Sequence, residues 1–346
     1  MQEAREISIH IILEERLGNG EEVLASLEEQ LFQDFQIVLL GQVNGERAQP
    51  DISDGKVMWL RNYRHRGFAR IHNQAVALAL ARWSQKDLSQ RLIVLCHPDV
   101  VWAPSALGCL REAFAKDPGL MIAGPTILRA RRIPRDDEGG SDVERTDEIE
   151  SQGADIYRSR RFVLRHQHEH LKEGGLAEPQ SVFAIPEPCV VIRASALQEL
   201  MIDGELLDPD IRVGQEMWDV MWRAKQMDME IRVIPEAVIW HYAHEPARAL
   251  STFQRLRDWY HPRARQQRLR EEERCLLELK NDDPLNRCLH LPWIMMSKFR
   301  RFFATCLDPR SLVWIEPERW LRIRHKRKEL KKRQRATRKS LRSWFR

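Results

Sequence analysis

The chain has 346 residues, of which 43% are apolar and 31% charged, and its formal net charge is +5. These values are typical of a folded globular protein and exclude collagen-like, low-complexity and wholly disordered chains. The six cysteines form no C-x-x-C pair, which argues against a zinc ribbon or a thioredoxin-type site, so we expect reduced thiols in a cytosolic protein. Neither a basic and apolar leader nor an apolar run of about 18 residues is present, so we expect no signal peptide and no membrane span.

The first 130 residues alternate between apolar runs and helical patterns. Short apolar runs predict strands at 7–13, 35–40, 57–60 and 91–96. Apolar residues three or four apart predict helices at 21–32 and 72–83. This alternation indicates βαβ units, and therefore an α/β fold with a mostly parallel sheet. Ligands of such sheets bind beyond the carboxyl ends of the strands, so the residues after these strands are the first candidates for a site.

The later part of the chain changes character twice. Residues 129–153 are polar and predict an exposed loop or insertion. Further strand and helix patterns occur at 181–193, 213–225 and 231–234. After about residue 250 the pattern becomes one of long charged helices. We therefore expect a first domain at 1–250 and a helical, basic extension at 251–346.

The charge is concentrated at the C-terminal end. Residues 319–346 contain 14 Lys and Arg and one acid, a net +13, so residues 1–318, with 42 basic and 50 acidic residues, carry −8. A basic tail favours a polyanionic partner, either nucleic acid or the anionic face of a membrane. The alternative is a solvated, partly helical tail. Within 289–307, the cations Lys298, Arg300 and Arg301 argue against a membrane span and favour an amphipathic surface helix with Trp293 and three phenylalanines (Phe299, Phe302 and Phe303) as anchors. The alternative is a helix packed on the first domain.

Two histidines and a carboxylate are candidate metal ligands. His97-Pro98-Asp99 directly follows the strand that ends at residue 96. A carboxylate at the carboxyl end of a strand can hold a divalent metal that neutralises a diphosphate, although Pro-Asp is also ordinary turn chemistry. His241 ends the segment 235–241 and could complete such a site, or be structural.

Two further segments have the residue types of a binding and a catalytic site. Gly67 permits close approach of a ligand to the backbone and opens a helix, and Arg70 and Asn73 lie one turn apart on that helix. Glu216 and Asp219 share one face of a later helix, so one of them could accept a proton from a hydroxyl nucleophile. The alternatives are an ordinary turn glycine and acids that favour a helix N-terminus.

Taken together and in order, these segments resemble bacterial family-2 glycosyltransferases, particularly their rhamnosyltransferase-like branch. That family typically reads G-F-A/G-x-x-x-N, N-P-D, P-x-A-L, G-P-x-x-L, G-A-C-x-x-I-R, E-D-x-D-L and P-E-A-x-x-x-H. The corresponding residues here, colinear over roughly 7–245, are GFARIHN at 67–73, HPD at 97–99, PSAL at 104–107, GPTIL at 124–128, CVVIR at 189–193, EMWD at 216–219 and PEAVIWH at 235–241.

The resemblance implies a Rossmann-like GT-A fold that binds a nucleotide-diphospho-sugar. It implies that Asp99 binds Mg²⁺ or Mn²⁺ at the donor diphosphate and that His241 joins this metal site, where His97 could be a further ligand. Gly67, Arg70 and Asn73 fall on the nucleotide-sugar-binding segment. The resemblance also implies that Glu216 and Asp219 are the catalytic carboxylates.

The implied reaction is inverting, metal-assisted transfer of a hexosyl group to a glycan acceptor, which we expect to be lipid-linked, in bacterial surface polysaccharide synthesis. The amphipathic segment 289–307 and the basic tail together predict a cytoplasmic enzyme that is peripheral on the inner face of the cytoplasmic membrane, where a lipid-linked acceptor would be found. The acidic body argues against the competing hypothesis of a nucleic-acid binder.

Several positions depart from the family pattern. Met217 replaces the second acid of E-D-x-D, so Glu216 or Asp219 would have to be the base, or the site is impaired. Gly41-Gln42-Val43-Asn44 stands where V-D-N-G is common, and His97 replaces the usual Asn. A catalytically degenerate glycosyltransferase that acts as a binding or scaffold protein in a glycan-assembly complex is therefore the alternative.

Overall fold

The computed structural model divides the chain into two compact units. It describes residues 5–13, 20–42, 56–62, 67–83, 87–134, 141–171, 178–242, 262–307 and 315–346. Unit 1 comprises residues 1–154, 164–207 and 229–243, and unit 2 comprises 155–163, 208–228 and 244–346. The expected boundary near residue 250 lies outside the described residues. Unit 2 also takes two segments that the sequence pattern alone assigns to the first domain.

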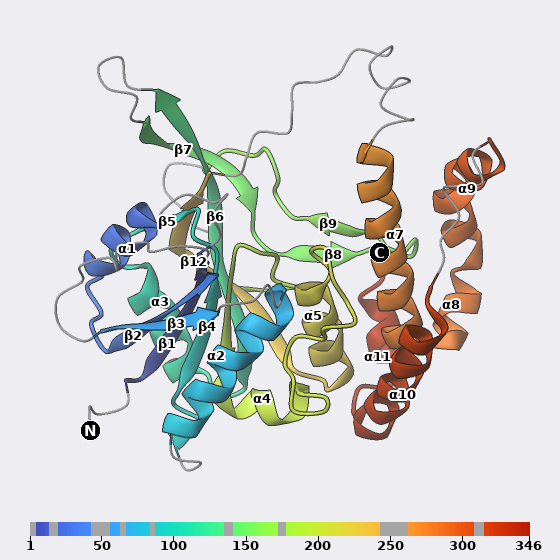
Figure 1. Cartoon of the computed structure of the whole chain (residues 1–346), viewed down its shortest axis with the longest axis horizontal. Coiled ribbons are helices and arrows are strands. Elements are labelled where there is room, and N and C mark those ends of the chain that lie inside the picture. Colours follow the sequence, from blue (N-terminus) through green and yellow to red (C-terminus); the bar gives the residue numbers. More distant parts are fainter. Residues whose placement is uncertain are drawn as a thin grey trace. The chain divides into compact units, whose positions relative to one another are not determined.

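Unit 1 is built on one mixed sheet (Figure 1). Its parallel half has the order β3-β2-β1-β4, formed by β1 (Ile7–Leu13), β2 (Phe35–Gln42), β3 (Val57–Asn62) and β4 (Leu92–Cys96). The order continues through β11 (Cys189–Arg193), β6 (Leu120–Pro134), β12 (Glu230–His241) and β10 (Gln180–Ser181). Strand β11 runs antiparallel to both neighbours, whereas β12 is parallel to β6. The predicted α/β fold is confirmed, but the sheet is mixed, not mostly parallel: the pairings within β3-β2-β1-β4 and between β6 and β12 are parallel, and the other pairings among the described strands of this sheet are antiparallel.

Helices cover both faces of this sheet because its strands bury both sets of alternating side chains. In β2, Phe35, Ile37 and Leu39 pack with α1 (Glu21–Glu28) and α3 (Ala106–Lys116). The intervening Val38 and Leu40 pack with α2 (Phe68–Arg82). The short helix α4 (Ala194–Leu200) follows β11 directly. The strand period of two therefore explains why this parallel half reads as continuous apolar runs.

Two predictions about unit 1 are wrong in a way that matters for the site. The expected loop at 129–153 is largely strand, because β6 extends to Pro134 and β7 (Ser141–Ser151) pairs with it antiparallel. Strand β7 has only two large apolar residues, Val143 and Ile149, so its composition predicts a loop, and pairing with β6 supplies its backbone hydrogen bonds. Strand β12 does not end at residue 234, because a register shift between Ile234 and Val238 lets it continue to His241.

Unit 2 contains the long charged helices that were predicted after residue 250. The described helices after residue 250 are α7 (Pro262–Asn281), α8 (Pro284–Leu289), α9 (Leu291–Leu307), α10 (Pro317–Arg333) and α11 (Arg338–Ser343). Unit 2 also contains the earlier helix α5 (Glu216–Gln226). Two short strands, β8 (Ala154–Ile156) and β9 (Phe162–Leu164), pair with each other. Among the described residues, no helix combines the length and the apolar character needed to cross a bilayer.

Much of the basic charge of the C-terminal end is paired inside unit 2. Lys326 on α10 lies 2.8 Å from Asp210 and also contacts Asp208, and Arg319 lies 2.6 Å from Glu273. Lys326 and Arg319 are both buried. Buried charges are paired because the desolvation of an isolated ion is prohibitive. These cations therefore join helices together, and fewer remain for an external polyanion than the sequence implies.

We expect unit 1 to lose stability in mild acid because of His10. Burial in β1 lowers the pKa of His10 from 6.5 to about 3, and the ring is neutral beside the Ser8 hydroxyl, 3.1 Å from Nε2. Below pH 6.5 the unfolded chain binds a proton that the folded state excludes, so stability is full above that pH and falls toward pH 3. From pH 8 to pH 5 the loss should be about 2 kcal/mol for this group. Urea unfolding of His10→Gln should show a weaker pH dependence than wild type, and an identical dependence would contradict the prediction.

Candidate metal site

Pairing of β12 with the segment after β4 brings three predicted metal ligands together. His97 and Asp99 follow β4, and His241 is the last residue of β12. Strand β5 (Val100–Trp102) pairs antiparallel with β12 so that His241 lies opposite Val100. The Tyr242 amide also donates to the Asp99 carbonyl oxygen at 3.2 Å. Residues about 140 positions apart in the sequence thus meet at the carboxyl end of a parallel strand.

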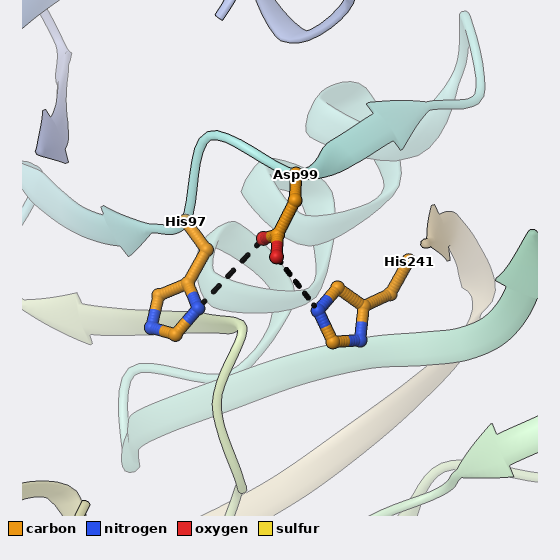
Figure 2. Close-up of side chains that lie close together, drawn as sticks. All are labelled: His97, Asp99 and His241. Atoms are coloured by element: carbon orange, nitrogen blue, oxygen red, sulfur yellow. Dashed lines mark ion pairs between the residues drawn. The ribbon is translucent and has the colours of Figure 1, made fainter. Parts of the chain in front are cut away.

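The three side chains point toward one another (Figure 2). Asp99 Oδ2 lies 3.4 Å from His241 Nε2, and Asp99 Oδ1 lies 3.8 Å from His97 Nδ1. One possible ligand atom from each residue lies within 4.8 Å of the other two. Asp99 is buried, and its Oδ1 accepts no hydrogen bond from any residue that the structure describes. Two imidazoles and a carboxylate are a suitable donor set for a divalent transition metal, so the residues fit the predicted cation.

Two histidines and two further carboxylates determine the charge around Asp99. Burial acts to raise the pKa of Asp99, but a hydrogen bond from His241 and the charges of both histidines hold it below its usual value. Burial acts to lower the pKa of His241, but hydrogen bonds and charge from Asp99 and Glu150 raise it to about 9. Burial, followed by the charge of Asp99, raises the pKa of Glu187 to about 7. Three carboxylates therefore lie in this part of unit 1, and the histidines between them offset their charge.

Glu150 and Glu187 are the residues of this region that sequence reasoning missed. Glu150 lies in β7, inside the segment predicted to be a loop, and Glu187 precedes β11. No local motif marks either residue. Only the alternation of charged residues in 141–151 could have indicated a strand there.

The predicted nucleotide-sugar-binding residues lie at the start of α2 in the same unit. Gly67 precedes the helix with a φ of 77°, and an added Cβ would meet no atom within 4 Å. Arg70 is exposed. The side-chain amide of Asn73 binds the backbone of Leu207. Asn73 Nδ2 donates to the Leu207 carbonyl oxygen at 2.8 Å, and Asn73 Oδ1 accepts from the Leu207 N–H at 2.9 Å. Asn73 therefore fixes a loop, and its contact with a donor stays a prediction.

The predicted catalytic carboxylates belong to unit 2, whereas the three metal ligands belong to unit 1. Asp219 is fully buried on α5 and accepts hydrogen bonds from Arg223 (3.0 Å), Lys280 (2.8 Å) and Asn281 (2.7 Å). These contacts favour a structural role for Asp219, the attachment of α7 to α5. Glu216, also buried, is in the first turn of α5. A catalytic role for either residue stays a prediction.

Two departures from the family pattern have a packing explanation. Gly41 on β2 lies against the Trp59 ring, and an added Cβ would be 2.9 Å from its Cζ2 atom, so no larger side chain fits without movement. Met217 is 2% exposed, so its apolar side chain is buried. A glycine at position 41 and an apolar residue at position 217 therefore suit their surroundings in this chain.

Comparison with known proteins identifies the fold class. No protein-family model matches the chain, and no curated protein matches it in sequence. The solved structure of GalNAc-T7 with UDP, GalNAc and Mn²⁺ aligns with a TM-score of 0.61 at 13% identity, covering 94% of this chain and 54% of that one. This chain thus spans about half the length of that structure.

Two further structures align more loosely. The mannosyltransferase PcManGT from Pyrobaculum calidifontis with GDP-Man and Mn²⁺ has a TM-score of 0.42 at 11% identity, with 95% of this chain and 86% of that one covered. S. aureus TarS has a TM-score of 0.47 at 10% identity, with 94% and 80% covered. On the strength of the GalNAc-T7 alignment and the sheet described above, the fold is that of the GT-A nucleotide-sugar transferases, as the sequence predicts.

Proposed function

We propose that this protein is a glycosyltransferase that moves a sugar from a nucleotide-sugar donor to a glycan acceptor with the help of a divalent metal. The observation that carries the proposal is the convergence of His97, Asp99 and His241 at the carboxyl end of β4. In open α/β sheets this edge is where ligands bind. The sequence motifs support the finer assignment, an inverting, hexosyl-transferring enzyme of the family-2, rhamnosyltransferase-like type in surface polysaccharide synthesis.

The chain's own residues have distinct parts in this reaction. His97, Asp99 and His241 would hold Mg²⁺ or Mn²⁺, and the bound ion would neutralise charge on the diphosphate leaving group. Glu216 would accept the proton of the acceptor hydroxyl as its oxygen attacks the anomeric carbon and the bond to the nucleoside diphosphate breaks. Asp219 is the less suitable base because Arg223, Lys280 and Asn281 already use its oxygens.

Thermal unfolding with nucleotides tests the donor site directly. Purified protein is heated with UDP, GDP, dTDP or CDP, each with and without Mn²⁺. One nucleotide should raise the unfolding midpoint, and only with the metal, because a ligand at 100 times its Kd adds roughly 2.7 kcal/mol to stability. If no nucleotide shifts the midpoint under either condition, the proposed function is wrong.

A degenerate, non-catalytic relative is the second candidate, favoured by Met217 and by the occupied oxygens of Asp219. It predicts nucleotide binding without turnover. Single-turnover assays with the nucleotide-sugar that corresponds to the stabilising nucleotide separate the two candidates. Release of nucleoside diphosphate supports an enzyme, whereas binding with no release supports the scaffold role.

A lipid-linked acceptor would place the enzyme at a membrane, and an apolar surface on α8 and α9 supports this partner. Its large apolar side chains are 41–74% exposed; they are Leu285, Leu289, Leu291, Trp293, Met295, Met296 and Phe299. Residues 284–307 contain four Lys or Arg and no acid. This combination suits an anionic bilayer surface. The side chains of Arg300, Arg301, Phe302 and Phe303 lie outside the described residues.

We name this surface the α8–α9 surface, and we assign the main membrane contact to it, with a smaller part for the basic tail. The sequence predicts membrane attachment through the amphipathic segment 289–307 together with the basic C-terminal tail. Arg319 and Lys326 of that tail are buried in internal ion pairs, so we propose that the α8–α9 surface is the principal contact with the cytoplasmic face of the membrane. The remaining exposed cations of α10 would add a weaker electrostatic attraction.

Vesicle co-sedimentation checks this proposal. The double variant Met295→Glu with Phe299→Glu should bind vesicles containing anionic lipid at least about tenfold more weakly, because each change removes an apolar side chain worth about 1.5–3 kcal/mol on burial and adds like charge to the lipid. Leu31→Glu is the matched control, since Leu31 is 78% exposed on unit 1. Equal binding of the double variant and wild type would overturn the assignment of this surface.

A further inference from the structure

Each histidine of the metal site has a second carboxylate on the side of its ring that faces away from Asp99. His241 presents Nε2 to Asp99, and its Nδ1 lies 3.0 Å from both carboxylate oxygens of Glu150. His97 presents Nδ1 to Asp99, and its Nε2 lies 3.6 Å from Glu187 Oε2, an ion-pair distance that is too long for a hydrogen bond. The five side chains therefore alternate in the order Glu187, His97, Asp99, His241, Glu150.

The sheet holds both outer carboxylates in place. Glu150 lies between Ile149 and Ser151, which pair with β6 at Leu128 and Ile127. Glu187 is two residues before β11, and the His97 amide donates to the Pro188 carbonyl oxygen at 2.9 Å. Two separate strand pairings thus place one carboxylate behind each imidazole.

We propose that Glu150 and Glu187 are positioning residues for the metal site. A carboxylate that accepts the proton of one ring nitrogen fixes the tautomer and the orientation of a histidine, so that the other nitrogen offers its lone pair to a metal. Glu150 would orient His241 in this way through its hydrogen bond, so that Nε2 faces Asp99. Glu187, 3.6 Å from His97 Nε2, would orient His97 by electrostatic attraction, so that Nδ1 faces Asp99. The site would then be assembled before any nucleotide arrives, so the protein binds Mn²⁺ by itself.

Mn²⁺ binding to the full chain without nucleotide tests the proposal, with free Mn²⁺ followed by electron paramagnetic resonance. Glu150→Ala and Glu187→Ala should each raise the Kd for Mn²⁺ by about 10- to 100-fold, as outer carboxylates do at other metal sites. Glu150→Gln, which keeps an acceptor oxygen but not the charge, should lie between Glu150→Ala and wild type. The unfolding midpoint of the metal-free protein is measured for each variant, so that loss of fold is not mistaken for loss of binding.

Glu148→Gln is the matched control. Glu148 lies on the same strand as Glu150 but pairs with Arg129 and His168, not with a metal ligand. Its Kd for Mn²⁺ should equal that of wild type. The proposal is overturned if Glu150→Ala and Glu187→Ala bind Mn²⁺ like wild type, or if wild type binds no Mn²⁺ at millimolar concentration.

This inference rests on the metal site of the proposed function but not on sugar transfer. Weakened Mn²⁺ binding in the variants, together with no midpoint shift by any nucleotide, would support the positioning role and refute the transferase. A nucleotide response in a protein that binds no Mn²⁺ alone would refute the positioning role and leave the transferase standing.

Discussion

Asp99→Asn should abolish the Mn²⁺-dependent response to nucleotide and reduce sugar transfer by at least about 10²- to 10³-fold, the usual effect of removing one preorganised electrostatic group. Asp99 is the residue that both histidines face, at 3.8 and 3.4 Å. Asparagine has nearly the same shape, so the change removes the negative charge and one good metal ligand with little change in volume. Nucleotide-dependent unfolding midpoints and initial transfer rates both measure the effect.

The fold should survive this substitution because Glu150 still pairs with His241, and because Glu187 loses a neighbouring like charge. Asp147→Asn is a suitable control, since Asp147 is an exposed carboxylate that pairs with His170 on the same unit. It should leave both measurements unchanged. Wild-type rates in Asp99→Asn would show that Asp99 is not part of the active site.

Lys280→Met should lower the free energy of unfolding by about 3–5 kcal/mol, the cost of breaking a buried ion pair on one side. Lys280 is almost fully buried on α7, with Nζ 2.7 Å from Asp208 and 2.8 Å from Asp219. Burial acts to raise the pKa of Asp208, but Lys280 and Lys326 outweigh it and hold that pKa far below its usual value. Without the ammonium group, two buried carboxylates lose a shared partner. Urea unfolding at neutral pH measures the loss.

Lys332→Met provides the comparison for that experiment. Lys332 pairs with Glu329 on α10, and its side chain is 71% exposed. Solvent screens such a pair, so its removal should change stability by less than about 0.5 kcal/mol. Similar effects of the two lysine substitutions would show that the buried network does not hold the helices of unit 2 together.

Asp219→Asn separates the structural and catalytic interpretations of that residue. The structural interpretation predicts a loss of stability comparable to that of Lys280→Met, because Arg223 and Lys280 both face Asp219. The catalytic interpretation predicts an inactive protein of normal stability. Glu216→Ala should instead reduce transfer with little change in the unfolding midpoint if Glu216 is the base.

The amino-acid sequence by itself determined the elements whose signal is local. Strand β1 occurs where its apolar run predicts it, and α2 begins only a few residues before its predicted start. The α/β class follows from this alternation. The family resemblance also pointed to His97, Asp99 and His241 as one predicted metal site. His97 and Asp99 directly follow the predicted strand at 91–96, whereas His241 lies seven residues beyond the predicted strand at 231–234.

Only the tertiary structure decided what surrounds these residues. Strand β7 exists because β6 offers a pairing edge, so Glu150 could not be placed behind His241 from its own polar segment. Likewise, Asp219 resembles a catalytic carboxylate in sequence, but Lys280, 61 residues further on, occupies its oxygens. Strand pairing and buried charge compensation join residues that are distant in the chain, and the local periodicity of side chains carries no information about such partners.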